Sequence, residues 1–132
     1  MQAATIKSPS PVEAAATSTE VISIDSLLHQ TVTKYGLNYN HFYDTLSCES
    51  EGFKDVAIQS QVPDPTGPNG YEDSWGLAQI WLAPKGHPEV TKAEATDPAY
   101  AIDFAGRLFS IGQENQFHCY SKEAELGWPA LQ

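Results

Sequence analysis

The residues best suited to chemistry lie in residues 46–53 (LSCESEGF), with Glu49 near the centre. On a helix, Phe42, Leu46 and Glu49 would share one face, because they are spaced by four and three residues. A carboxyl group on an apolar face loses hydration, which raises its pKa, and the helix end that Gly52 predicts raises it further. A glutamic acid that is protonated near neutral pH can serve as a general acid. The same pattern also fits a glutamate that only closes an exposed last turn.

Two cysteines, Cys48 and Cys119, and the neighbouring His118 offer other chemistries. Cys48 and His118 could be the nucleophile and base of a peptidase, although the acidic residue after Cys48 would disfavour the thiolate. The same three side chains could bind zinc, although they lack the usual CxxC spacing. The two cysteines could also form one disulfide, but they are too few for a disulfide-rich scaffold.

Residues 61–73 (QVPDPTGPNGYED) break the helical pattern with three prolines and two glycines. Asn69-Gly70 is a strong turn signal, so we expect a long irregular loop or a short hairpin. Long structured loops in small domains are often functional. The acids of this loop, Asp64, Glu72 and Asp73, raise the alternative of calcium, but their spacing does not match an EF-hand and we expect no metal.

Residues 74–81 (SWGLAQIW) form an apolar run that contains one polar amide, Gln79. A buried glutamine needs hydrogen-bond partners, so Gln79 is either a structural donor or a ligand contact. The aromatic residues Trp75 and Trp81 could belong to the core or form a platform for a sugar ring. The core is the default interpretation for each of them taken singly.

Three helices must position these segments, and their starts are marked by N-cap residues. The predicted caps are Ser23, then Asn38 or Asn40, then Asp97 with Pro98 in the first turn. The second helix runs into Glu49, and the third carries an apolar stripe of Ala101, Ile102, Ala105, Leu108 and Phe109. Residues 1–21, rich in Ala, Ser, Thr and Pro, are predicted to be a flexible tail or linker. Residues 22–132 are then one mainly α domain with one long irregular loop.

Composition excludes several classes of partner. The formal net charge is −10 with only seven basic residues, which argues against nucleic acid and against anionic membrane surfaces. No apolar run is long enough to span a bilayer, and no signal peptide is visible. We expect a monomer without a cofactor and without membrane insertion.

Three motifs in this order resemble the lysozyme-like fold of the soluble lytic transglycosylase and goose-type lysozyme group. Glu49-Ser50 is followed by Gly52-Phe53, residues 75–80 read WGLAQI, and a helix begins at Asp97-Pro98. The resemblance covers about residues 24–120. The chain departs from the group in lacking an Ala-Tyr-Asn-Ala-Gly segment, for which Tyr120 is a loose positional substitute. It also has a longer loop over residues 61–73, and Trp81 where goose-type relatives carry an aspartate.

The resemblance implies cleavage of the β-1,4 bond between N-acetylmuramic acid and N-acetylglucosamine in peptidoglycan. Glu49 would protonate the leaving oxygen and then act as base on the muramyl hydroxymethyl group, giving an anhydro product without water. The implied sugar contacts are Ser50, Ser74, Gln79 and Tyr120, with Trp75 as a wall of the cleft. A hydrolytic goose-type-like lysozyme is an alternative, and its second acid would come from Asp64, Glu72 or Asp73. A non-catalytic peptidoglycan-binding module is a third reading, which would have no need of Glu49.

A peptidoglycan substrate would place the protein outside the cell or in the cell envelope. In that setting the only two cysteines, Cys48 and Cys119, are predicted to form a disulfide. Chain entropy gives it a stabilisation of about 4 kcal/mol as an upper figure. The bond would join the helix that bears Glu49 to the C-terminal segment.

Overall fold

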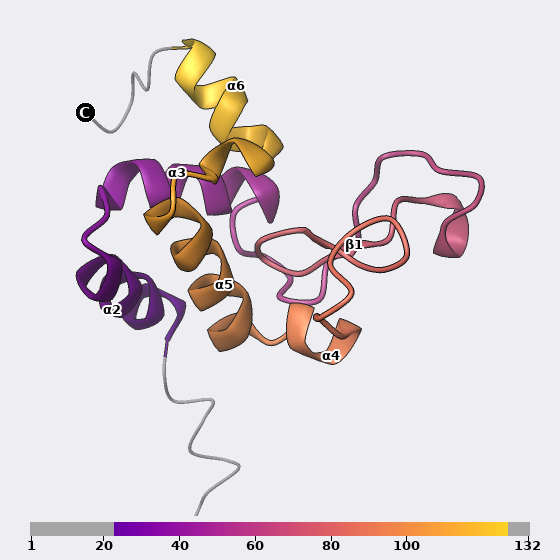
Figure 1. Ribbon diagram of the computed structural model, residues 1–132, viewed down its shortest axis with the longest axis horizontal. Coiled ribbons are helices and arrows are strands. Elements are labelled where there is room, and N and C mark those ends of the chain that lie inside the picture. The colour runs from indigo at the N-terminus through magenta and orange to yellow at the C-terminus, as the bar shows by residue number, and fades with distance from the viewer. Residues whose placement is uncertain (1–22, 127–132) are drawn as a thin grey trace, which may run out of the picture.

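The computed structural model describes residues 23–126, and this part of the chain is mainly helical (Figure 1). The helices are α2 (Ile24–Tyr35), α3 (Tyr39–Glu49), α4 (Lys92–Ala95), α5 (Pro98–Ser110) and α6 (His118–Leu126). Two 3₁₀ turns, η1 (Pro68–Gly70) and η2 (Glu114–Gln116), and two short strands, β1 (Ser74–Trp75) and β2 (Ile80–Trp81), complete the elements. The predicted mainly α class is therefore confirmed. The predicted tail, residues 1–21, lies outside the described residues.

The helix starts follow the predicted caps. Ser23, Asn38 and Asp97 each accept a hydrogen bond from a backbone N–H in the first turn of α2, α3 and α5, respectively. This satisfies a donor that has no partner within the helix. Of the two candidates for α3, the cap is thus Asn38. At the other end of α2, Gly36 adopts the left-handed conformation expected of a helix stop, with φ 68°.

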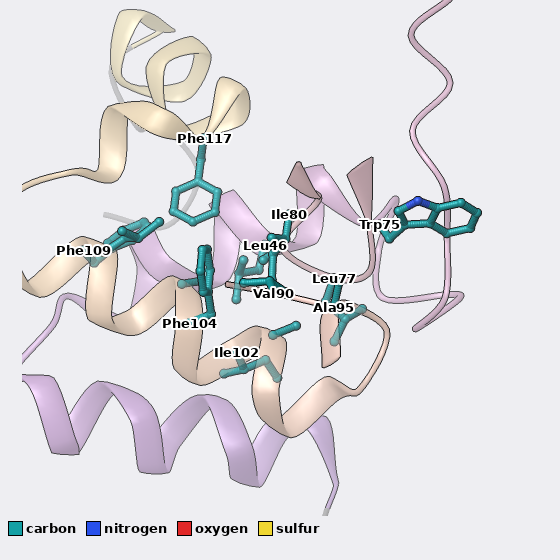
Figure 2. Close-up of a cluster of buried hydrophobic side chains, with 14 of the residues drawn as sticks. Leu46, Trp75, Leu77, Ile80, Val90, Ala95, Ile102, Phe104, Phe109 and Phe117 are labelled. Carbon is teal, nitrogen blue, oxygen red and sulfur yellow. The ribbon is translucent and has the colours of Figure 1, made fainter. Parts of the chain in front are cut away.

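The hydrophobic core lies between α3, α5 and the β1–β2 hairpin (Figure 2). All five residues of the predicted stripe on α5 are buried, together with Phe104. Phe42 and Leu46 of α3 are fully buried, and the ring of Phe42 packs edge-on against Phe109 at 5.1 Å between centroids. Helix α2 covers α5 closely: a Cβ added to Gly106 would lie 2.3 Å from Cγ2 of Thr31. Because Phe42 and Leu46 are locked into the core, the orientation of α3 is fixed, and so is the position of Glu49 at its end.

The loop over residues 61–73 folds back on itself as a short, hairpin-like excursion. The Asp64 N–H donates to the Gly70 carbonyl, and the Glu72 N–H donates to the Val62 carbonyl. The reversal occurs in η1, where Asn69 has a left-handed φ of 58°. Figure 1 shows this excursion extending away from α2 and α5. Its returning arm leads directly into β1.

The β1–β2 hairpin pairs Ser74 with Trp81 and Trp75 with Ile80. Its turn begins at Gly76, where an added Cβ would lie 1.8 Å from the carbonyl oxygen of Ala95 at the end of α4. Any other residue at this position would push the hairpin off α4. Within residues 23–126, no helix is long and apolar enough to cross a membrane.

Candidate functional site

Glu49 is the last residue of α3 and is partly buried. Burial raises the pKa of its carboxyl, and the negative charge of Glu72 acts in the same direction. The opposing influences are the backbone N–H of Cys119, which donates to Glu49 Oε2 at 2.9 Å, and the nearby His118. The raised pKa agrees with the expectation from sequence, and its main cause is loss of hydration.

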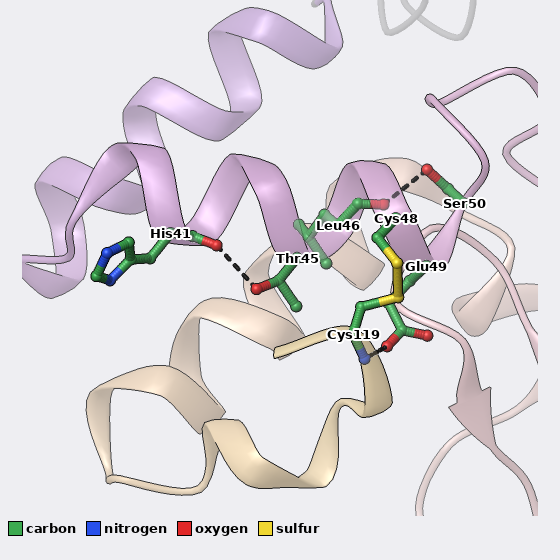
Figure 3. Close-up of a disulfide and its surroundings, with 7 residues drawn as sticks. All are labelled: His41, Thr45, Leu46, Cys48, Glu49, Ser50 and Cys119. Atoms are coloured by element: carbon green, nitrogen blue, oxygen red, sulfur yellow. Dashed lines mark hydrogen bonds between the residues drawn. A yellow bond between two sulfur atoms is a disulfide. The ribbon is translucent and has the colours of Figure 1, made fainter. Parts of the chain in front are cut away.

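Cys48 and Cys119 form the predicted disulfide, which joins the end of α3 to the first turn of α6 (Figure 3). The bond lies next to Glu49 and holds the Cys119 N–H against the carboxylate. Because both thiols are used, the peptidase and zinc alternatives are wrong. In the described part of the chain, no group of three or more His, Cys, Asp or Glu side chains is placed so that it could hold a metal ion.

Ser50 shapes the turn that follows the catalytic candidate. It is 0% exposed, its hydroxyl donates to the Leu46 carbonyl at 2.7 Å, and it accepts from the Phe53 N–H at 2.9 Å. These bonds hold a turn in which Glu51, Gly52 and Phe53 all have positive φ angles. Such a run is strained for residues with side chains and needs support. The prediction that Ser50 contacts a sugar is therefore corrected: its role is to fix the end of α3.

A cleft of about 530 Å³ opens beside Glu49. Glu72, Ser74 and Gln79 were predicted site residues, and the fold brings all three to this cleft with Glu49. The other polar side chains that line the cleft are mostly amides and hydroxyls, namely Gln59, Ser60, Gln61 and Gln116. The carboxyl of Glu51, the imidazole of His118 and the indole of Trp81 also line it. The lining comes from the end of α3, the segment after it, the hairpin, and the start of α6.

Ser74 and Gln79 are held in place by hydrogen bonds of their own. The Ser74 hydroxyl donates to Glu72 Oε1 at 3.2 Å. The Gln79 amide nitrogen donates to the carbonyls of Ile58 and Gly76, at 3.2 and 3.0 Å. Both hydrogens of that amide are thereby used, so a ligand would meet its oxygen. Gln79 is thus a structural donor that also lines the cleft.

Trp75 and Tyr120 do not line the cleft. Trp75 is 8% exposed and lies at the edge of the core in Figure 2. Its indole N–H donates to Asp73 at 2.6 Å, and Lys92 Nζ lies 3.9 Å from its ring centroid. Tyr120 packs edge-on against Phe109 and borders a separate cavity next to Gly36. The predicted sugar-contact roles of both aromatic residues are therefore corrected to packing roles.

Asp64 and Asp73 border a different cavity, of about 230 Å³. The Thr66 hydroxyl and then Lys85 lower the pKa of Asp64 to about 2. The Lys85 ammonium lies 3.0 Å from Asp64 and ties the loop to the turn after β2. Of the three candidate second acids, Glu72 is the one that lines the cleft with Glu49.

Sequence reasoning missed the contributions of Gln116, Trp81 and the Gln59–Gln61 segment. The predicted disulfide did carry a signal for Gln116, because a residue close to Cys119 is brought near Glu49. Trp81 was named as an aromatic candidate for the core or for a sugar platform. Which of these it is depends on which face of the hairpin it lies on, and strands of two residues are too short to show an alternating pattern in the sequence. Nothing in the sequence marked Gln59 or Gln61.

Comparisons with protein-family models, curated proteins and solved structures give no match for this chain.

Proposed function

We propose that this protein is a peptidoglycan-cleaving muramidase with a lysozyme-like fold. Its activity would be that of a lytic transglycosylase, which cuts the β-1,4 bond between N-acetylmuramic acid and N-acetylglucosamine. One observation carries the proposal: Glu49, with its pKa raised by burial, lines a polar cleft at the end of a disulfide-anchored helix. The motifs around Glu49 and in residues 75–80 support the same reading.

In this mechanism Glu49 acts twice. As an acid, it donates its proton to the glycosidic oxygen, and the bond from that oxygen to C1 of the muramyl unit breaks. As a carboxylate, it then takes the proton of the muramyl C6 hydroxyl while that oxygen bonds to C1. The products are a 1,6-anhydromuramyl end and a free hydroxyl on the leaving sugar, and Glu49 is protonated again.

The surroundings of Glu49 support both steps. Burial favours the protonated acid that begins the cycle. The Cys119 N–H, 2.9 Å from Oε2, stabilises the carboxylate that exists between the two proton transfers. The amide oxygen of Gln61 and the amide of Gln116, whose nitrogen gives one hydrogen to Gln113 Oε1, can pair with sugar hydroxyl and acetamido groups. The amide of Gln59 supports the cleft instead, because it bonds to the carbonyls of Pro68 and Glu72 and to Asn69.

Hydrolysis is a second candidate, and the position of Glu72 favours it. Glu72 lines the same cleft and its charge helps to raise the pKa of Glu49. A second carboxylate near the acid could orient a water molecule for attack on C1. The product would then be a reducing end instead of an anhydro end.

In either case the expected partner is a peptidoglycan glycan strand, and the expected location is the extracellular space or the cell envelope. A disulfide that anchors the site is suited to an oxidising compartment. A non-catalytic module remains the outcome if no cleavage occurs.

The test is mass analysis of purified peptidoglycan after digestion. Anhydromuramyl ends support the transglycosylase, reducing ends support the hydrolase with Glu72, and intact strands with bound protein support the module. Glu49→Gln is the inactive comparison. Glu114→Gln is the matched control, because Glu114 lies in η2 and does not line the cleft.

A further inference from the structure

We propose that Trp81 is a sugar-stacking residue that carries the glycan groove past the Glu49 cleft into a second cavity. The ligand would be a β-1,4-linked N-acetylhexosamine chain longer than a disaccharide. This inference rests on the proposed function for its ligand class, but it concerns binding and not the chemical step.

The second cavity, of about 490 Å³, adjoins the Glu49 cleft. Both are lined by Gln79, Trp81 and Gln116. Trp81 is 39% exposed, whereas its strand neighbour Ile80 is 2% exposed, as alternation along a strand requires. The exposed indole of Trp81 therefore borders both the Glu49 cleft and the second cavity.

The backbone beneath this indole is fixed in place. Trp81 pairs with Ser74 of β1, and its carbonyl accepts the His87 N–H at 2.7 Å. Gly86 packs directly below, since a Cβ added there would lie 2.1 Å from the Trp81 carbonyl oxygen. A platform held this way loses little conformational freedom on binding, which favours affinity.

The chemistry of the second cavity suits a sugar that is bound but not cleaved. Phe104, Leu108 and Phe117 form an apolar wall, and the amides of Gln79 and Gln116 lie at the shared edge. The described residues that line it include no aspartate or glutamate, in contrast to the Glu49 cleft. The apolar face of a pyranose ring and its acetyl methyl group match the wall and the indole, and its hydroxyls match the amides.

Binding can be measured without cleavage in the Glu49→Gln protein. Calorimetric titration with the disaccharide and the hexasaccharide of N-acetylglucosamine gives the affinity gained from chain length. We expect the hexasaccharide to bind more tightly, and Trp81→Ala to raise its Kd about threefold to tenfold. The hexasaccharide Kd of Trp81→Phe should lie between those of the Trp81 protein and Trp81→Ala, because phenylalanine keeps a smaller aromatic ring and leaves the strand undisturbed. The disaccharide Kd should change less than the hexasaccharide Kd.

Ile111→Ala is the matched control, since Ile111 is an exposed apolar residue, 54% accessible, that lines neither hollow. Equal hexasaccharide affinity with and without the Trp81 ring overturns the inference, as does a wild-type protein that binds no oligosaccharide. Binding that requires a muropeptide would also overturn it, because the second cavity would then hold a peptide. If wild-type protein cleaves nothing but Trp81-dependent binding persists, the proposed reaction fails and this inference stands.

Discussion

Two opposing effects act on the pKa of Glu49. Burial against the core favours its protonated form, and the Cys119 N–H at the start of α6 favours its carboxylate. An acid that must give up a proton and take one back in the same turnover benefits from both. The balance is set by backbone positions, because the disulfide fixes the donor and the packing of α3 fixes the carboxyl.

Glu49→Gln should abolish cleavage and leave the fold intact. Gln is nearly isosteric and can still accept the Cys119 N–H, but it cannot donate or regain a proton. Loss of a positioned proton donor lowers rates by ~10²–10⁴-fold, and we expect the high end because one residue serves both steps of the proposed mechanism. Circular dichroism and the rate of anhydromuramyl release check this. If more than about a tenth of the rate survives, Glu49 is not the acid, and Glu72 becomes the next candidate.

The same substitution should stabilise the protein in a pH-dependent way. Because the folded-state pKa of Glu49 is raised, its favourable contribution is complete below the unfolded pKa and is lost as pH rises through the folded pKa. The unfolding free energy of Glu49→Gln should therefore match wild type near the ordinary glutamate pKa of about 4 and exceed it at neutral pH. Urea melts across this range measure the difference. A difference that does not vary with pH would contradict the burial of the acid.

Among the residues of the cleft, the sequence predicted Glu49 but not most of the side chains around it. Helical spacing alone placed Glu49 beside Phe42 and Leu46. Ser50 and Trp75 were misassigned because a motif shows which residues recur, and not which of them are buried. Whether Trp75 or Trp81 faces solvent depends on a strand register that only the folded hairpin defines.

Helices α2, α3 and α5 were predictable from local signals, and the hairpin was not. Ser23, Asn38 and Asp97 satisfy donors within their own first turns, so a short window of sequence is enough to locate α2, α3 and α5. The β1–β2 hairpin instead depends on contact between Gly76 and the end of α4. That contact joins distant segments and has no local signature.

Breaking the disulfide should lower both stability and activity. The bond closes a sequence separation of 71 residues, so replacing both cysteines with serine should reduce stability by up to about 4 kcal/mol. The start of α6 would loosen, and the Cys119 N–H would no longer be held against Glu49. Thermal melts and product release, with and without reductant, measure the two effects. Alkylation before and after reduction, read by intact mass, confirms the bond; two free thiols in unreduced protein would contradict it.

The whole molecule carries a charge that bears on its proposed substrate. The formal net charge is −10, and the Glu49 cleft itself contains Glu51 and Glu72. Cell walls carry anionic polymers, so approach to an intact wall is opposed by long-range repulsion. A neutral oligosaccharide meets no such repulsion. Charge should therefore affect encounter with the wall and leave the chemical step untouched.

Activity on whole cell walls should accordingly be weak at low ionic strength and rise as salt is added. Screening shortens the reach of the repulsion from about 30 Å at 0.01 M salt to about 10 Å at 0.1 M. Turbidity loss of purified walls across this range measures the effect. The control is cleavage of a soluble, uncharged glycan fragment at the same salt concentrations, which should stay level. A lysis rate that falls steadily as salt rises would mean that attraction, and not repulsion, governs the encounter, and would point to a cationic patch acting against the net charge.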